Sequence, residues 1–109
     1  MTDFDLVIRN GTVATASDTT QCDVAIKDGI VAALGRALPA GVREIDAAGR
    51  LVLPGAIDSH CHIEQRSSAG VMCADDFYSA TVSAAFGGTT TVIPFAAQHR
   101  GQSLRRVVE

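Results

Sequence analysis

The sequence is poor in the large aromatic residues that usually dominate a small hydrophobic core. It has no tryptophan, one tyrosine and four phenylalanines, so aromatic residues make up only 5% of the chain. Because 47% of its 109 residues are nevertheless hydrophobic, the composition is that of a small globular region and excludes a disordered segment. A core must therefore be built mainly from alanine, valine, isoleucine and leucine.

Cysteine is also scarce and is not arranged for pairing. The three cysteines, Cys22, Cys61 and Cys73, stand at unrelated spacings without a CxxC pair, which excludes a disulfide framework. A signal peptide is not indicated, because Asp3 and Asp5 stand where such a leader carries positive charge. No apolar run approaches the length of a membrane span. We therefore expect a reducing, cytoplasmic setting.

Positive charge is too sparse to form a binding patch. Nine lysines and arginines stand against 12 acidic residues, which gives a formal net charge of -3. The only basic doublet, Arg105-Arg106, is best explained as the solvated face of a helix. We therefore expect neither a nucleic-acid partner nor an anionic membrane surface.

The first half of the chain alternates short apolar runs with tight turns. Asn10-Gly11 and Asp28-Gly29 are both typical of type I′ hairpin turns. Residues 1–53 are therefore predicted to form a small antiparallel β unit, part of a β-sandwich, whose open edges need a partner. Its strands are expected at residues 5–9, 12–15, 22–26, 30–34 and 42–46.

After Pro54-Gly55 the pattern changes to strands that alternate with helices. Buried strands are expected at residues 56–62 and 89–93, because both runs are apolar or β-branched. The intervening helix is expected to begin at Asp75 or Asp76 and to end at Gly87-Gly88. A second helix is expected from residue 101, with Ser103 as its cap.

The order strand, helix, strand, helix indicates parallel strands joined by crossover helices. A (β/α)8 barrel places its chemistry at the carboxyl ends of such strands and takes about 250 residues when complete. The predicted fold class is therefore α/β: residues 54–109 are expected to be the first βαβα part of a TIM-type barrel that this chain does not finish. We accordingly expect the chain to be an N-terminal part of a longer protein.

A pair of histidines ends the first of these strands. His60 and His62 are two residues apart, so on a strand they point to the same side while Cys61 points to the other. Two adjacent imidazoles make half of a metal site. Asp58 lies on the same face and is expected to orient an imidazole or to join the ligands.

The residues around this pair resemble a known signature. Pro54-Gly-Ala-Ile-Asp-Ser-His-Cys-His62 resembles the Pro-Gly-x-Ile-Asp-x-His-x-His signature of the metal-dependent amidohydrolase superfamily. Residues 74–90 are similar to the hydantoinase and dihydropyrimidinase branch, and the hairpins of the first half resemble the family's N-terminal β unit. The resemblance covers nearly the whole chain. One departure is Ala56, where a second glycine is common.

This resemblance implies a hydrolase that opens a cyclic amide ring of the hydantoin or dihydropyrimidine type. Such enzymes use two divalent metal ions, usually zinc, which are bridged by a carboxylated lysine and by the hydroxide that attacks the amide carbonyl. The resemblance also implies a homo-oligomer, which is a tetramer in the family. His60 and His62 would bind one of the two metals, and Gln65 and Ser67 would lie in the loop that borders the substrate.

The remaining catalytic groups are not expected within these residues. The only lysine, Lys27, lies in the β unit upstream of the histidine pair, and is not expected to be the bridging ligand. The third histidine, His99, follows the second strand and is better explained as an exposed loop residue. No catalytic residue is therefore assigned within this segment. We expect the 109 residues alone to bind metal weakly and to turn over no substrate.

Other interpretations remain open. Dihydroorotases resemble the chain up to His62 but usually place an arginine two residues later, where this sequence has Glu64. Allantoinases usually continue with an Asn-Glu-Pro-Gly run, which Glu64-Gln65-Arg66 does not match. The non-enzymatic dihydropyrimidinase-related scaffold proteins lack the metal ligands, so His60 and His62 argue against that alternative. The open edges of an incomplete barrel also favour association of the chain with itself.

Overall fold

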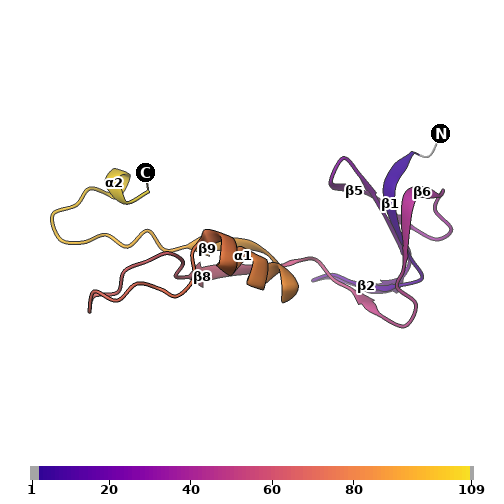
Figure 1. Cartoon of the computed structure of the whole chain (residues 1–109). Helices are drawn as coiled ribbons and strands as arrows, with labels where there is room; N and C mark the ends of the chain where they lie inside the picture. The colour runs from indigo at the N-terminus through magenta and orange to yellow at the C-terminus, as the bar shows by residue number, and fades with distance from the viewer. Residues whose placement is uncertain (1–2, 109) are drawn as a thin grey trace. The chain divides into compact units, whose positions relative to one another are not determined.

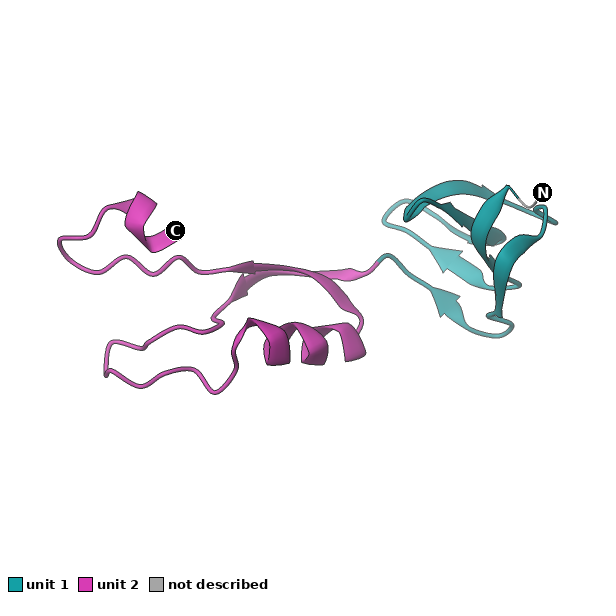
Figure 2. Cartoon of the chain, turned by 45° about the horizontal axis from the view of Figure 1, so that its top comes forward, with its two compact units in different colours: residues 1–54 teal, residues 55–109 magenta. Residues whose placement is uncertain are grey.

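The structure is a computed structural model that describes residues 3–108, and these fall into two compact units (Figures 1 and 2). Unit 1 is Met1–Pro54, coloured teal in Figure 2, and its described part holds strands and no helix. Its strands are β1 (Phe4–Arg9), β2 (Thr12–Ala14), β3 (Thr19–Gln21), β4 (Asp23–Lys27), β5 (Ile30–Gly35), β6 (Gly41–Asp46) and β7 (Leu51–Val52).

Unit 2, Gly55–Glu109, combines strands with helices. Its elements are β8 (Ala56–Cys61), α1 (Phe77–Phe86), β9 (Thr89–Pro94) and α2 (Leu104–Val108). None of the helices within residues 3–108 has the length and apolar character needed to cross a membrane.

The strands of unit 1 form two sheets, a four-stranded one in the order β5-β4-β1-β6 and a three-stranded one in the order β3-β2-β7. The hairpin predicted at Asp28-Gly29 is confirmed, since it joins β4 to β5 in antiparallel pairing. Asp28 has φ 50° and Gly29 has φ 75°, and a type I′ turn requires positive φ at both positions.

The hairpin predicted at Asn10-Gly11 is wrong, because β1 and β2 belong to different sheets. Asn10 has a positive φ of 60°, but Gly11 has no positive φ and is buried. A Cβ at Gly11 would lie 2.5 Å from Cγ2 of Val52. The glycine therefore permits a close approach where the chain passes from one sheet to the other.

The prediction of an all-antiparallel β unit is also corrected. β1 pairs parallel with β6, and β2 pairs parallel with β7 (Figure 1). Residues 4–14 and 41–52 thus run in the same direction from the first sheet into the second. Turn dipeptides reveal only pairings between strands that are neighbours in sequence, so they could not indicate these two.

The core of unit 1 is built from small aliphatic side chains, as the composition predicts. Val7 on β1 and Ala25 on β4 have no exposed surface, and they lie opposite each other in the antiparallel pair. Val13, Val24 and Ala47 are also buried. Burial of these side chains supplies the main favourable term for folding.

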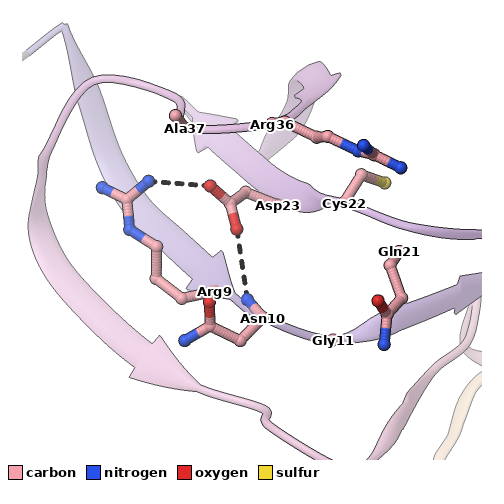
Figure 3. Close-up of a pocket in the computed structure, with 8 residues that line it drawn as sticks. All are labelled: Arg9, Asn10, Gly11, Gln21, Cys22, Asp23, Arg36 and Ala37. Atoms are coloured by element: carbon pink, nitrogen blue, oxygen red, sulfur yellow. Dashed lines mark hydrogen bonds and ion pairs between the residues drawn. The ribbon is translucent and has the colours of Figure 1, made fainter.

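One buried carboxylate joins three segments of unit 1. Asp23, which is 7% exposed, accepts hydrogen bonds from Arg9 Nη1 at 3.0 Å and from the backbone N–H of Asn10 at 3.1 Å (Figure 3). It also accepts from the N–H of Leu38 at 3.3 Å. The Asn10 bond most of all, with those of Arg9 and Leu38, lowers the pKa of Asp23 although burial opposes this.

This lowered pKa predicts that unit 1 loses stability in acid. The Asp23 contribution is fully present above the unfolded carboxyl pKa of about 3.9 and is lost as pH falls through the lower folded pKa. Asp23→Asn should cost about 1.5 kcal/mol at neutral pH, because a charged acceptor is replaced by a neutral one. Chemical denaturation at a series of pH values should show that the free energy of unfolding of the variant falls less steeply in acid. An unchanged dependence on pH would contradict the assignment.

In unit 2 the predicted strand, helix and parallel strand are confirmed. β8 and β9 pair in parallel, with Asp58 opposite Val92 and Cys61 opposite Pro94. The cap of α1 is Asp76, whose Oδ1 accepts from the N–H of Ser79 at 2.7 Å. The predicted ends are also found, since α1 stops at Gly87-Gly88 and the Ser103 hydroxyl caps α2 by accepting from Arg106 N–H at 3.3 Å.

The expectation that both strands of unit 2 are buried is not met within residues 3–108. Ile57 on β8 is 65% exposed and Ile93 on β9 is 54% exposed. The two-stranded sheet packs against α1 through β9 (Figure 2). The half-buried helix residues are Ala80 and Ala84. One helix of small residues cannot cover both faces of a sheet, so the apolar side chains remain in contact with solvent.

Candidate metal-binding site

The histidine pair lies at the carboxyl end of β8, where the strand leaves the sheet. The ring centroids of His60 and His62 are 5.6 Å apart and their planes meet at 65°. The predicted placement on one side of the strand is therefore confirmed. Both residues are exposed, so both imidazoles are accessible to a solute.

A phenylalanine from the neighbouring strand completes this cluster of rings. Phe95 directly follows β9, and its backbone N–H donates to the carbonyl of Cys61 at 2.9 Å. Its ring centroid lies 4.5 Å from that of His60 and 4.9 Å from that of His62, with the His62 ring stacked at 14°. Sequence reasoning missed Phe95, although the carboxyl ends of parallel strands meet at one edge and it follows the strand next to β8.

The loop after the pair folds back on itself and contacts His62. Oε1 of Gln65 lies 2.7 Å from Nδ1 of His62. Backbone bonds hold the loop as an irregular hairpin, with Cys73 N–H donating to Gln65 O at 2.9 Å and Ser67 N–H to Val71 O at 2.8 Å. A hollow of about 250 Å³ lies beside the imidazole and is lined by His62, Gln65, Ser67 and Cys73.

The carboxylate of Asp58 acts on the backbone of the pair. Its Oδ1 accepts from the N–H of His60 at 3.0 Å, which fixes the chain at the first histidine. Asp58 is expected from the sequence to act on an imidazole, but the contact observed is with the main chain. Direct support of an imidazole by this carboxylate stays a prediction.

The other candidate ligands have contacts of their own. Lys27 forms an ion pair with Asp5 at 3.0 Å, and this hydrogen bond raises the pKa of the Lys27 ammonium. His99 lies in the loop after β9, where its N–H donates to Oε1 of Gln102 at 3.1 Å. Across residues 3–108 no group of three or more His, Cys, Asp or Glu side chains is placed to hold a metal ion.

The donor set nevertheless suits part of a metal site. A neutral imidazole binds zinc and other divalent metals through whichever ring nitrogen lacks a proton. Gln65 occupies Nδ1 of His62 and leaves Nε2 available. The described residues can therefore supply two nitrogen ligands, and a tightly held ion needs others in addition.

Comparison with known proteins shows what the chain is similar to. No family model matches the chain. The chain is 49% identical over 105 residues to a D-hydantoinase of Ralstonia pickettii. The match covers 96% of this chain and 23% of that protein. The chain is 44% identical over 110 residues to a dihydropyrimidinase of Rattus norvegicus, covering 95% of the chain and 21% of that protein.

A solved structure agrees with the sequence comparison. A D-hydantoinase structure superposes with a TM-score of 0.88 at 48% identity, over 96% of this chain and 23% of that one. The chain thus spans less than a quarter of the length of each of these proteins. Over the matched residues, the chain is therefore similar to D-hydantoinases and to a dihydropyrimidinase.

Proposed function

We propose that the chain is part of a metal-dependent hydrolase that opens a cyclic amide ring of the hydantoin or dihydropyrimidine type. In this proposal, His60 and His62 supply two ligands to one of two divalent metal ions, with zinc the expected metal. The observation that carries it is the pair of adjacent, accessible imidazoles at the end of β8. The relationship to hydantoinases supports the choice of substrate class.

A divalent metal bound here would supply a Lewis acid that lowers the pKa of a bound water and polarises a carbonyl. The chain contributes the framework that holds the ligands. Phe95 stacks on His62, and Asp58 fixes the backbone at His60. We infer that the hollow beside His62 receives part of the substrate, with Ser67 at its border.

We infer further features of the complete protein from the exposed surfaces of unit 2. Residues 1–53 would be a β-sandwich segment and residues 54–109 the start of a (β/α)8 barrel, in a cytoplasmic homo-oligomer. The parallel β8–α1–β9 arrangement supports the barrel. The exposed Ile57 and Ile93 support it as well, because further elements of a barrel would cover such side chains.

The proposal is tested by metal analysis and activity of the complete protein that contains this chain. We expect two equivalents of metal per chain, and hydrolysis of a hydantoin or dihydropyrimidine that a chelator abolishes and zinc restores. A non-enzymatic scaffold of the dihydropyrimidinase-related type would contain no metal and show no hydrolysis. That result would overturn the proposal.

A companion prediction concerns the 109 residues alone. The purified, zinc-loaded chain should bind metal weakly and hydrolyse neither substrate class, because only two ligands lie together among the described residues. Zinc titration and a ring-opening assay with each substrate measure this. Turnover by the chain alone would contradict the prediction and show that it holds a complete site.

A further inference from the structure

The contact between Gln65 and His62 favours one position for the proton of the imidazole. Gln65 presents Oε1, a carbonyl oxygen, at 2.7 Å from Nδ1 of His62. A carbonyl oxygen can only accept a hydrogen bond, so Nδ1 must be the donor. A neutral imidazole has one N–H, and Nε2 is therefore left with a free lone pair.

The glutamine is itself held in place before any ligand arrives. Its backbone carbonyl accepts from Cys73 N–H at 2.9 Å across the loop hairpin, and its side chain is half-buried. The His62 ring is restrained on its face by the stacked Phe95 at 4.9 Å. Ring orientation and tautomer are thus both set by neighbours within unit 2.

His60 differs from His62 in this respect. Within residues 3–108 no side chain forms a hydrogen bond with the His60 ring, and its contacts are with the rings of His62 and Phe95. Two histidines that are equivalent in the sequence pattern are therefore unequal in the structure. Only His62 has a partner that selects one tautomer.

We propose that Gln65 is a positioning residue that holds His62 in the Nδ1–H tautomer and so keeps Nε2 ready to bind a divalent cation. The metal part of this inference rests on the proposed function, whereas the tautomer does not. It also changes the role expected for Gln65. Its amide oxygen is engaged with the imidazole, whereas the Ser67 hydroxyl, which accepts from Val71 N–H at 3.2 Å, keeps its own O–H to donate to a substrate in the hollow.

The tautomer is measured directly on the metal-free 109-residue chain labelled with ¹⁵N-histidine. Long-range ¹H–¹⁵N spectra at about pH 8, where a free imidazole is neutral, distinguish protonated from unprotonated ring nitrogens. We expect Nδ1 of His62 to be protonated in the unchanged chain and in Gln65→Glu, which keeps an acceptor oxygen. In Gln65→Leu, which has none, the ring should become a mixture of tautomers.

Ser67→Ala is the matched control, because Ser67 lines the same hollow and its hydroxyl bonds to Val71 N–H, whereas the bond to the imidazole comes from Gln65. It should leave the His62 spectrum unchanged, and the His60 signals should move in none of the variants. A His62 ring that is protonated at Nε2 in the unchanged chain would overturn the inference. So would a tautomer that Gln65→Leu leaves unaltered.

Zinc titration then tests the consequence. Gln65→Leu should weaken zinc binding about 10-fold or more, the usual effect of losing a partner of a metal-bound histidine, while Gln65→Glu and Ser67→Ala retain the affinity. Equal zinc affinity in Gln65→Leu, despite an altered tautomer, would overturn the positioning role. Absence of zinc binding in the unchanged chain would instead contradict the prediction that the two histidines bind metal weakly on their own, and the spectra would still decide the tautomer.

Discussion

Replacing both His60 and His62 with alanine is expected to abolish zinc binding by this chain and hydrolysis by the complete protein. The two imidazoles are neighbours at 5.6 Å, and no other group of metal-binding side chains is assembled within residues 3–108. Alanine offers no nitrogen ligand. Isothermal titration with zinc measures the first loss, and metal content with a ring-opening assay measures the second.

His99→Ala is the matched control for this experiment. It makes the same chemical change in the same unit, at a residue whose observed contacts are with Gln102 through the backbone. This variant should bind zinc as the unchanged chain does. Far-ultraviolet circular dichroism should confirm that the double variant still folds, since it also loses the rings packed against Phe95. Unaltered zinc affinity in a folded double variant would refute the assignment of these ligands.

Gly55→Ala is expected to destabilise unit 2 by about 3 kcal/mol, the upper range for inserting a methyl group where no space exists. A Cβ at Gly55 would lie 2.0 Å from Oγ1 and 2.7 Å from Cβ of Thr90. Gly55 immediately precedes β8 and Thr90 lies on β9, so the added methyl group would force apart the strands that carry the site. Denaturation followed at 222 nm, where α1 dominates the signal, measures the loss.

Gly87→Ala makes the same substitution at a position with room. Its Cβ would meet Ala84 O at 3.4 Å, an ordinary contact, and the φ of Gly87 is -83°. This variant should retain the stability of the unchanged chain. The double variant Gly55→Ala with Thr90→Gly should recover part of the stability that Gly55→Ala loses. If the two substitutions instead lower the free energy of unfolding additively, the two side chains do not collide.

Local patterns predicted the elements of unit 2 because each depends on neighbouring residues. Asp76 and Gly87-Gly88 mark the two ends of α1 through hydrogen bonds within a few positions. The spacing of His60 and His62 places them on the same side of the strand. Phe95 and the Gln65–His62 bond were not predicted. Both depend on how a loop or a second strand returns to β8, and residue spacing along one strand carries no such information.

The error in unit 1 has a related cause. Asn10-Gly11 has the composition of a hairpin turn, yet the amide of Asn10 bonds to Asp23 and Gly11 lies against Val52. These tertiary contacts override the local preference and direct the chain into a second sheet. At Asp28-Gly29 the amide of Asp28 likewise bonds to a distant carboxylate, that of Asp5, but no atom crowds Gly29, and the dipeptide forms the turn that its sequence favours.

The parallel pairing of residues 4–14 with residues 41–52 sets the order in which unit 1 can fold during synthesis. The β4–β5 hairpin can close as soon as its own residues leave the ribosome, because its strands are joined by two residues. β1 and β2 can pair with β4 and β3 before that point, but their other edges must wait for β6 and β7, and contacts between such distant segments form slowly. Until residue 52 has emerged, both sheets keep an open edge along the strands that link them.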